Sequence, residues 1–198
     1  MNVVIFNTGW GNLGVVKYWL IKMGFEVTIS SYLSQAHSGS VLVIPGMQNS
    51  VNLSRILHDE VNKLGVPMEE VYMKVIGICA GFHALCNSIN EGNDYTSGLN
   101  IFNTSCVPIF NDGSHNTGWL NLEFNKSKFM HKVERSNSSF YFNHAYGVIS
   151  KVSDCDEIIY GKEKIRVIVK KGIWWGVQFH PECSGTNGES LFKGIVKL

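Results

Sequence analysis

The chain has 198 residues, of which 44% are apolar and 17% are charged. This length suits one sizeable domain, and we expect a single domain over residues 1–198. Seventeen basic and sixteen acidic residues give a formal net charge of +1, which favours neither a nucleic-acid partner nor a polybasic membrane anchor. No apolar run reaches the ~18 residues of a membrane span, and the N-terminus lacks the basic stretch and cleavage site of a signal peptide. We therefore expect a cytoplasmic protein.

The cysteines follow no disulfide or zinc pattern. Their number is odd, and no two are spaced as Cys-x-x-Cys, so we expect neither a disulfide framework nor a metal site. Most of them should be small buried apolar residues. The five are Cys79, Cys86, Cys106, Cys155 and Cys183.

The first half of the chain alternates between short apolar runs and helical patterns. This alternation is typical of an α/β fold with a parallel sheet and right-handed crossovers. Continuous apolar runs predict strands that are covered on both faces. The expected strands are 3–6, 25–30, 41–44 and 75–78, and the expected helices are 12–23, 51–64 and 80–90.

The second half is richer in short strand-like segments. Asn, Asp, Gly and Ser separate them, as in antiparallel connections. We expect these strands to extend the parallel sheet or to lie beside it, before a final helix over 189–196. The expected strands are 100–110, 120–124, 140–144, 147–152, 165–170 and 174–178.

A glycine-rich run at 9–14 reads G-x-G-x-x-G between a predicted strand and a predicted helix. A dinucleotide fingerprint occupies this context, but it also needs an acidic residue at the end of the second strand. That strand ends in Ile29-Ser30-Ser31, and Trp10 is bulky for its place between two glycines. We interpret the run as a tight turn at the carboxyl edge of the sheet, where ligands and partners bind.

A sharper motif is Gly-Ile-Cys-Ala-Gly at 77–81. Its glycines permit a strained strand-to-helix turn that lifts Cys79 above the sheet, as in a nucleophile elbow. A helix N-terminus would stabilise the thiolate, and the Ala80 N–H would point at an oxyanion beside the sulfur. The alternative is a buried core cysteine in a glycine-rich turn.

The run Gly-Val-Gln-Phe-His-Pro-Glu at 176–182 favours the nucleophile. A predicted strand ends at His180, and a turn at Pro181 would let Glu182 face the same site. A cysteine nucleophile needs a base within reach of its sulfur and an acid that fixes the tautomer of the base. We therefore predict a catalytic triad of Cys79, His180 and Glu182.

These two motifs together resemble the class I, or triad, glutamine amidotransferases. Further motifs resemble the glutaminase subunits of imidazole glycerol phosphate synthases, and the resemblance runs along nearly the whole chain. These are Gly-x-Gly-Asn-Leu at 9–13, Pro-Gly at 45–46, Thr-Gly-Trp-Leu-Asn at 117–121, Tyr-Phe-Asn-His-Ala-Tyr at 141–146 and His-Pro-Glu-Cys-Ser-Gly at 180–185.

The resemblance implies a flavodoxin-like three-layer fold whose mostly parallel central sheet carries added antiparallel strands. It implies that Cys79 attacks the side-chain amide of glutamine, that His180 transfers protons and that Glu182 orients His180. The ammonia would pass to a (β/α)₈-barrel partner subunit, which forms imidazole glycerol phosphate and an aminoimidazole carboxamide ribotide in histidine biosynthesis. No metal or organic cofactor is needed.

The resemblance also assigns a substrate pocket and a partner surface. The partner surface comprises Asn12, Trp119 and Tyr141. The residues assigned to the substrate and the oxyanion are Gly46, Met47, Ala80, His83, Glu91, His144, Ala145 and Tyr146.

The chain departs from the family pattern at several places around this pocket. Gln48 stands where a glycine usually follows in the oxyanion loop, and His83 stands where glutamine usually contacts the substrate. Ala145 replaces a serine or threonine, and Cys183 replaces a lysine or arginine. Glu91 does stand where the family places an acid for the substrate α-amino group.

These departures leave other functions open. One is a paralogue that supplies ammonia to a different synthase, such as one that amidates a cell-surface sugar. Another is a catalytically weak subunit that only binds its partner, although such a subunit has no need of all three triad residues. A third is a cysteine hydrolase of the same layout, such as a γ-glutamyl peptidase, against which the segments around Trp119 and Tyr141 argue.

Overall fold

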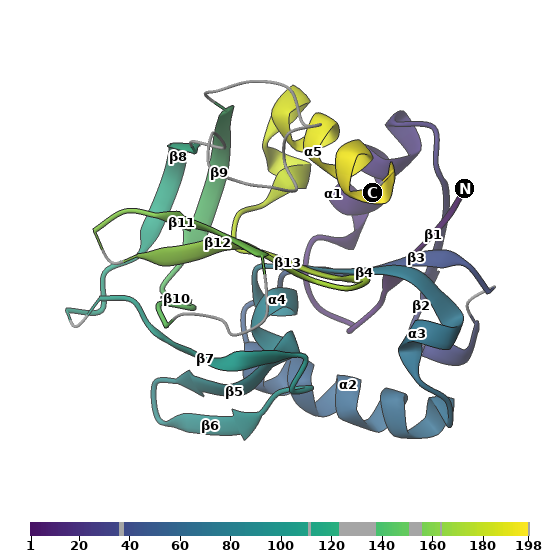
Figure 1. Cartoon of the computed structure of the whole chain (residues 1–198), viewed down its shortest axis with the longest axis horizontal. Coiled ribbons are helices and arrows are strands. Elements are labelled where there is room, and N and C mark those ends of the chain that lie inside the picture. Colours follow the sequence, from purple (N-terminus) through teal and green to yellow (C-terminus); the bar gives the residue numbers. More distant parts are fainter. Residues whose placement is uncertain (36–37, 111, 123–137, 151–155, 163, 198) are drawn as a thin grey trace.

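The computed structural model describes residues 1–198 apart from 36–37, 111, 123–137, 151–155, 163 and 198. Within this part of the chain, none of the helices has both the length and the apolar character that crossing a membrane requires. The fold is α/β, with a central sheet between two layers of helices (Figure 1).

The central sheet has seven strands in the order β11-β12-β13-β4-β3-β1-β2. Its five neighbouring strands from β13 to β2 run parallel, and β12 and β11 extend it antiparallel. The strands are β1 (Asn2–Phe6), β2 (Glu26–Ser30), β3 (Ser40–Ile44), β4 (Tyr72–Ile78), β11 (Asp156–Tyr160), β12 (Ile165–Lys171) and β13 (Trp174–Val177).

Helices cover both faces of this sheet (Figure 1). The helices α1 (Leu13–Lys22) and α5 (Gly185–Lys197) pack on one face, and α2 (Ser50–Leu64), α3 (Met68–Val71) and α4 (Ala80–Leu85) pack on the other. Alternate residues of β1 therefore enter different cores: Val3 and Ile5 pack with α1 and α5, whereas Val4 and Phe6 pack with α2 and α4. Burial on both faces explains why the parallel strands have continuous apolar sequences.

Two smaller sheets flank the central one. The first has the order β10-β7-β5-β6 and contains β5 (Cys86–Glu91), β6 (Asp94–Ser97), β7 (Phe102–Pro108) and β10 (Tyr146–Gly147). The second is the antiparallel pair β8 (Asn116–Leu122) and β9 (Ser138–His144). Two short 3₁₀ helices, η1 (Leu33–Gln35) and η2 (Pro181–Cys183), complete the described elements.

The predicted α/β class and the antiparallel additions are confirmed, but the predicted helix over 80–90 is wrong. The helix α4 ends at Leu85, and the chain turns at once into β5. In a longer helix, the carbonyl groups of Ala84 and Leu85 would accept hydrogen bonds from the next turn. Here they accept from a more distant segment: the Leu99 N–H donates to Ala84 O over 2.8 Å, and the Ile101 N–H donates to Leu85 O over 3.0 Å. Pairing of β5 with β6 and β7 then satisfies the backbone that follows.

Other boundaries differ in detail. The last helix begins at Gly185, four residues before its predicted start. The predicted strands 120–124 and 147–152 extend into 123–124 and 151–152, which lie outside the described residues. The described parts show β8 beginning at Asn116 and β10 ending at Gly147. The elements α3 and β6 were not predicted. A single turn such as α3 is too short to show a helical period, and β6 has the sequence Asp-Tyr-Thr-Ser, which contains no apolar run.

Candidate active site

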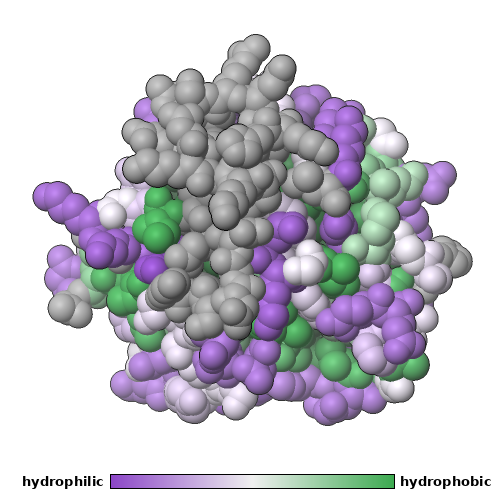
Figure 2. Space-filling model, in the orientation of Figure 1, coloured by the Kyte–Doolittle hydropathy of each residue, from purple (hydrophilic) through white to green (hydrophobic). Residues whose placement is uncertain are grey.

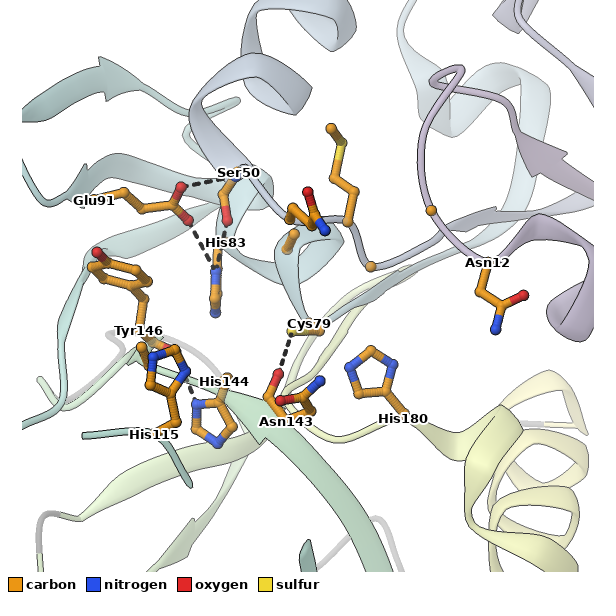
Figure 3. Close-up of a pocket in the computed structure, with 16 residues that line it drawn as sticks. Asn12, Ser50, Cys79, His83, Glu91, His115, Asn143, His144, Tyr146 and His180 are labelled. Atoms are coloured by element: carbon orange, nitrogen blue, oxygen red, sulfur yellow. Dashed lines mark hydrogen bonds and ion pairs between the residues drawn. The ribbon is translucent and has the colours of Figure 1, made fainter. Parts of the chain in front are cut away.

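A cavity of about 430 Å³ lies at the edge of the central sheet where β3, β4 and β13 end. The chain places Gly46, Cys79 and His180 just after these three strands (Figure 3). All eight residues predicted to bind the substrate or the oxyanion line this cavity. They are Gly46, Met47, Ala80, His83, Glu91, His144, Ala145 and Tyr146.

Cys79 occupies a strained turn between β4 and α4. Its φ is 51° and its ψ is −109°, a conformation that non-glycine residues rarely adopt. The flanking glycines have no room for a side chain: a Cβ on Gly77 would lie 2.5 Å from the Gly81 oxygen, and one on Gly81 would lie 2.1 Å from the Ile44 oxygen. The predicted elbow is confirmed, and Cys79 is 7% exposed at the cavity floor.

His180 faces Cys79 across the cavity, and Glu182 lies behind it in η2. The His180 Nδ1 atom is 2.8 Å from Glu182 Oε1. Burial disfavours the imidazolium, but hydrogen bonds with Cys79 and Glu182 outweigh burial and raise the pKa of His180 to about 11. The imidazole therefore holds a proton next to the sulfur, and the structure brings the three predicted triad residues together.

The backbone of His180 is held by the β8–β9 hairpin. The His180 N–H donates to the Tyr141 oxygen over 2.8 Å, which makes an isolated bridge between the two residues. The Ser184 hydroxyl donates to the His180 oxygen over 2.6 Å and accepts from the Tyr141 N–H over 3.0 Å. These bonds fix the base through its main chain, independently of Glu182.

Gly11 and Gly46 explain the glycine-rich run after β1. A Cβ on Gly11, whose φ is 99°, would lie 2.7 Å from the Gly46 oxygen. A Cβ on Gly46 would lie 3.0 Å from His180 Cε1 and 3.3 Å from Cys79 Cβ. The turn at 9–14 thus supports the loop that passes between the predicted nucleophile and base, as expected for a tight turn at the carboxyl edge.

The opposite wall of the cavity carries polar groups from α2, α4 and β5 (Figure 3). Glu91 Oε2 accepts from the Ser50 N–H over 3.0 Å, and the Ser50 hydroxyl lies 2.9 Å from His83 Nδ1. Burial lowers the pKa of His83 to about 4. Burial also raises the pKa of the Glu91 carboxyl, although the bonds from Ser50 oppose this rise.

His144 is another histidine that lines the cavity. Its Nδ1 atom lies 2.9 Å from the Tyr146 oxygen, and its Nε2 atom lies 3.1 Å from Asn116 Nδ2. Burial lowers the pKa of His144 to about 4. Both His83 and His144 are therefore neutral near pH 7, which leaves His180 as the protonated imidazole among the three.

Several polar residues near the cavity were not predicted as site residues. Ser50, His115 and Asn143 line it, and Gln178 lies beneath Cys79 with its Nε2 atom 3.8 Å from the sulfur. Asn143 and Gln178 stand inside motifs that were recognised, so their positions carried a signal. Ser50 and His115 are in segments without a motif.

The residues assigned to the partner surface lie at the same sheet edge. Asn12 lines the cavity beside Gly11. Trp119 on β8 is 57% exposed, and its ring meets that of Tyr141 on β9 edge to face, with centroids 6.0 Å apart. Figure 2 shows hydrophilic and hydrophobic residues interspersed over the described part of one face of the molecule. The structure thus places Asn12, Tyr141 and Trp119 near one another.

Solved structures with the same fold define the class of protein. A structure described as a glutamine amidotransferase superposes with a TM-score of 0.72 at 17% identity, covering 98% of this chain and 97% of that one. A structure of PurLQS from Thermotoga maritima gives a TM-score of 0.72 at 16% identity, with coverages of 99% and 97%. The fold is therefore that of the glutamine amidotransferases.

The sequence identifies the family. The family model "Glutamine amidotransferase class-I" matches residues 13–198, so the chain belongs to the class I glutamine amidotransferase family. A Haemophilus influenzae relative named "Imidazole glycerol phosphate synthase subunit HisH" is 30% identical over 197 residues, covering 100% of this chain and 98% of the relative. A Methanopyrus kandleri relative of the same name is 31% identical over 210 residues, with coverages of 99% and 98%.

Proposed function

We propose that this protein is the glutaminase subunit of an imidazole glycerol phosphate synthase, acting as one functional unit over residues 1–198. The observation that carries the proposal is the convergence of Cys79, His180 and Glu182 in one cavity at the carboxyl edge of the sheet. The names and the near-complete coverage of the relatives support the choice of synthase.

In the proposed reaction, the Cys79 thiolate attacks the side-chain amide carbon of glutamine. The C=O bond opens to an oxyanion, for which Ala80 N–H and the loop of Gly46 and Met47 are the predicted donors. His180 gives its proton to the amide nitrogen, the C–N bond breaks and ammonia leaves. His180 then takes a proton from water, which attacks the thioester and releases glutamate and the Cys79 thiolate.

The far wall suits the amino-acid end of the substrate. A glutamine α-ammonium group beside Glu91 would favour the ionised carboxylate and offset the burial that raises its pKa. His144, Ala145 and Tyr146 would line the space around the substrate backbone. A cavity of about 430 Å³ falls in the range typical of small-molecule sites.

The ammonia is proposed to pass to a (β/α)₈-barrel partner subunit in a heterodimer. Because that partner performs the acceptor chemistry, Cys79→Ala should abolish glutamine-dependent synthesis, lowering its rate by more than about 10³-fold. Synthesis from ammonium salts should persist, since the variant removes only the nucleophile. The measurement compares imidazole glycerol phosphate formation from glutamine and from ammonium in the reconstituted complex.

Two outcomes would contradict the proposal. Glutamine-dependent synthesis by Cys79→Ala would exclude Cys79 as the nucleophile. Normal glutamine hydrolysis without any product from the histidine-pathway barrel would favour a sister synthase. A diazo-ketone analogue of glutamine provides the control, because it should label Cys79 in preference to the other cysteines.

We also expect slow hydrolysis by the isolated chain. With Gln48 where a glycine usually follows in the oxyanion loop, partner binding is proposed to complete the second donor. One missing oxyanion donor costs on the order of 10²–10³ in rate. Glutamate release should therefore rise by about that factor when the barrel subunit and its ligand are added, and full activity without a partner would contradict this mechanism.

A further inference from the structure

A chain of buried polar groups reaches the sulfur of Cys79 through Gln178 and His83. Gln178 is 0% exposed and His83 is 2% exposed. Gln178 Nε2 is 3.8 Å from Cys79 Sγ, and Gln178 Oε1 is 3.0 Å from His83 Nε2. On its other side, His83 Nδ1 is 2.9 Å from the Ser50 hydroxyl.

The direction of each hydrogen bond follows from the first. A thiolate accepts hydrogen bonds, so the amide NH₂ of Gln178 must face the sulfur and its carbonyl oxygen must face His83. That oxygen needs a donor, which makes His83 the Nε2–H tautomer. Its Nδ1 atom then accepts from the Ser50 hydroxyl, and Glu91 Oε1 lies farther from it, at 4.0 Å. Burial keeps His83 in this neutral form.

The space around the amide admits this arrangement. A Cβ on Gly147 would lie 3.0 Å from Gln178 Oε1, so the absence of a side chain there leaves room for the carbonyl oxygen beside His83. With His83 in this tautomer, its Nε2–H donates to the amide oxygen of Gln178, and the NH₂ end of the amide faces the sulfur. The histidine therefore selects which end of the amide meets the sulfur.

We infer that Gln178 donates a hydrogen bond to the Cys79 thiolate and that His83 is the positioning residue that orients its amide. The inference rests on the proposed role of Cys79 as the nucleophile. This inference assigns a role to His83, which occupies the position where the family usually has glutamine. Loss of the donor should favour the thiol over the thiolate.

Other titratable groups around Cys79 also affect its ionisation, so they must be the same in every variant that is compared. His180 with Glu182 lies on one side, and His144 is bonded to Tyr146 and Asn116. The remaining ionisable groups that line the cavity are Glu91, His115 and Tyr146. Variants at His83 and Gln178 leave all of these side chains in place.

The experiment measures the rate of Cys79 alkylation by iodoacetamide against pH, followed on the Cys79 peptide by mass spectrometry. His83→Leu removes the donor to Gln178, and Gln178→Met removes the donor to the sulfur with little change in volume. Each should raise the pH midpoint of alkylation by about one unit, which corresponds to about 1.4 kcal/mol. His83→Gln keeps an amide donor at this position, so the midpoint of this variant should equal that of the wild-type protein.

Ser54→Ala is the matched control. Ser54 is a buried serine of α2, one turn beyond Ser50, and its hydroxyl donates to the Ser97 oxygen rather than to the cavity. This variant should lose some stability and keep the wild-type midpoint. Circular dichroism shows whether each variant is folded. If His83→Leu does not fold, the comparison of Gln178→Met with Ser54→Ala still tests the inference.

An unchanged midpoint in Gln178→Met would overturn the inference. A midpoint in His83→Gln that is shifted as far as in His83→Leu would also overturn it. A shift in Ser54→Ala as large as in Gln178→Met would attribute the effect to lost stability and would also overturn it. Alkylation does not require glutamine hydrolysis. A protein that shifts as expected but releases no glutamate would therefore refute the proposed function and leave this inference standing.

Discussion

The two buried histidines of the cavity wall should make the stability of the protein depend on pH. Burial lowers the pKa of both His83 and His144 to about 4, whereas an unfolded histidine titrates near about 6.5. Below that value the unfolded state binds more protons than the folded state, so stability is lost as the pH falls towards 4. Each histidine should remove about 2 kcal/mol from the free energy of unfolding by pH 5.

Urea unfolding between pH 8 and pH 5 measures this loss. Between these two pH values His83→Gln should lose about 2 kcal/mol less stability than the wild-type protein, because glutamine does not titrate. His180 acts in the opposite direction above about pH 6.5, because its raised pKa keeps the proton in the folded state while the unfolded state loses it. Both proteins contain His180, so its contribution cancels when the two are compared. A variant that loses stability as steeply as the wild-type protein would show that His83 is not held neutral.

For individual residues, the sequence predicted those contacts that follow from the position of a residue along its strand. Cys79 and His180 follow parallel strands, and such strands end at one edge of a sheet. The hydrogen bond between His83 and Gln178 joins residues 95 positions apart. No local pattern encodes which buried polar groups pair, so this contact could not be predicted.

Among the elements, α5 determines the position of the predicted orienting acid. A Cβ on Gly188 of α5 would lie 1.9 Å from the Pro181 oxygen, where η2 begins. Gly188→Ala should therefore displace η2, move Glu182 away from His180 and lower the rate of glutamine hydrolysis by about 10²-fold. The clash with backbone should also cost about 2 kcal/mol or more of stability.

Gly14→Ala is the control for this change. Gly14 lies in α1, and a Cβ there would meet nothing within 4 Å. Alanine is a better helix former than glycine by about 0.5–1 kcal/mol, so this variant should unfold at the same or a higher temperature with unchanged activity. Equal activity in the two variants would refute the role assigned to α5.

The wrong prediction of a helix over 80–90 shows what the sequence could not supply. The helical pattern is satisfied as far as Leu85, and only the bonds from the segment at 99–101 end the helix there. This competition is non-local, so periodicity cannot detect it. The early turn also has a consequence for the site, because β5 brings Glu91 back to Ser50 at the cavity wall.

For the whole molecule, the proposed partner surface makes a prediction about assembly. Trp119 is 57% exposed and forms a T-shaped pair with Tyr141, so much of its ring is accessible to anchor a partner. Trp119→Ala should raise the dissociation constant for the barrel subunit by about 30-fold, equivalent to about 2 kcal/mol. Calorimetric titration of the two subunits measures it.

Tyr95→Ala provides the comparison for this surface. Tyr95 is an aromatic residue of β6 that is 69% exposed, and β6 lies at the far side of the molecule from β8 and β9 (Figure 1). This variant should bind the barrel subunit as the wild-type protein does. If both variants bound equally well, the aromatic pair would not be part of the interface.

The bond between the hairpin and the base has a consequence for divergence among related proteins. Tyr141 holds His180 through its carbonyl oxygen, and every amino acid has that group. Mutation can therefore change the side chains at 119 and 141, which belong to the proposed partner surface, without disturbing the main-chain support of the imidazole. An insertion or deletion within β9 would shift the register and remove that support. As lineages acquire new synthases, substitutions should thus accumulate in this hairpin, while the length of β9 stays the same.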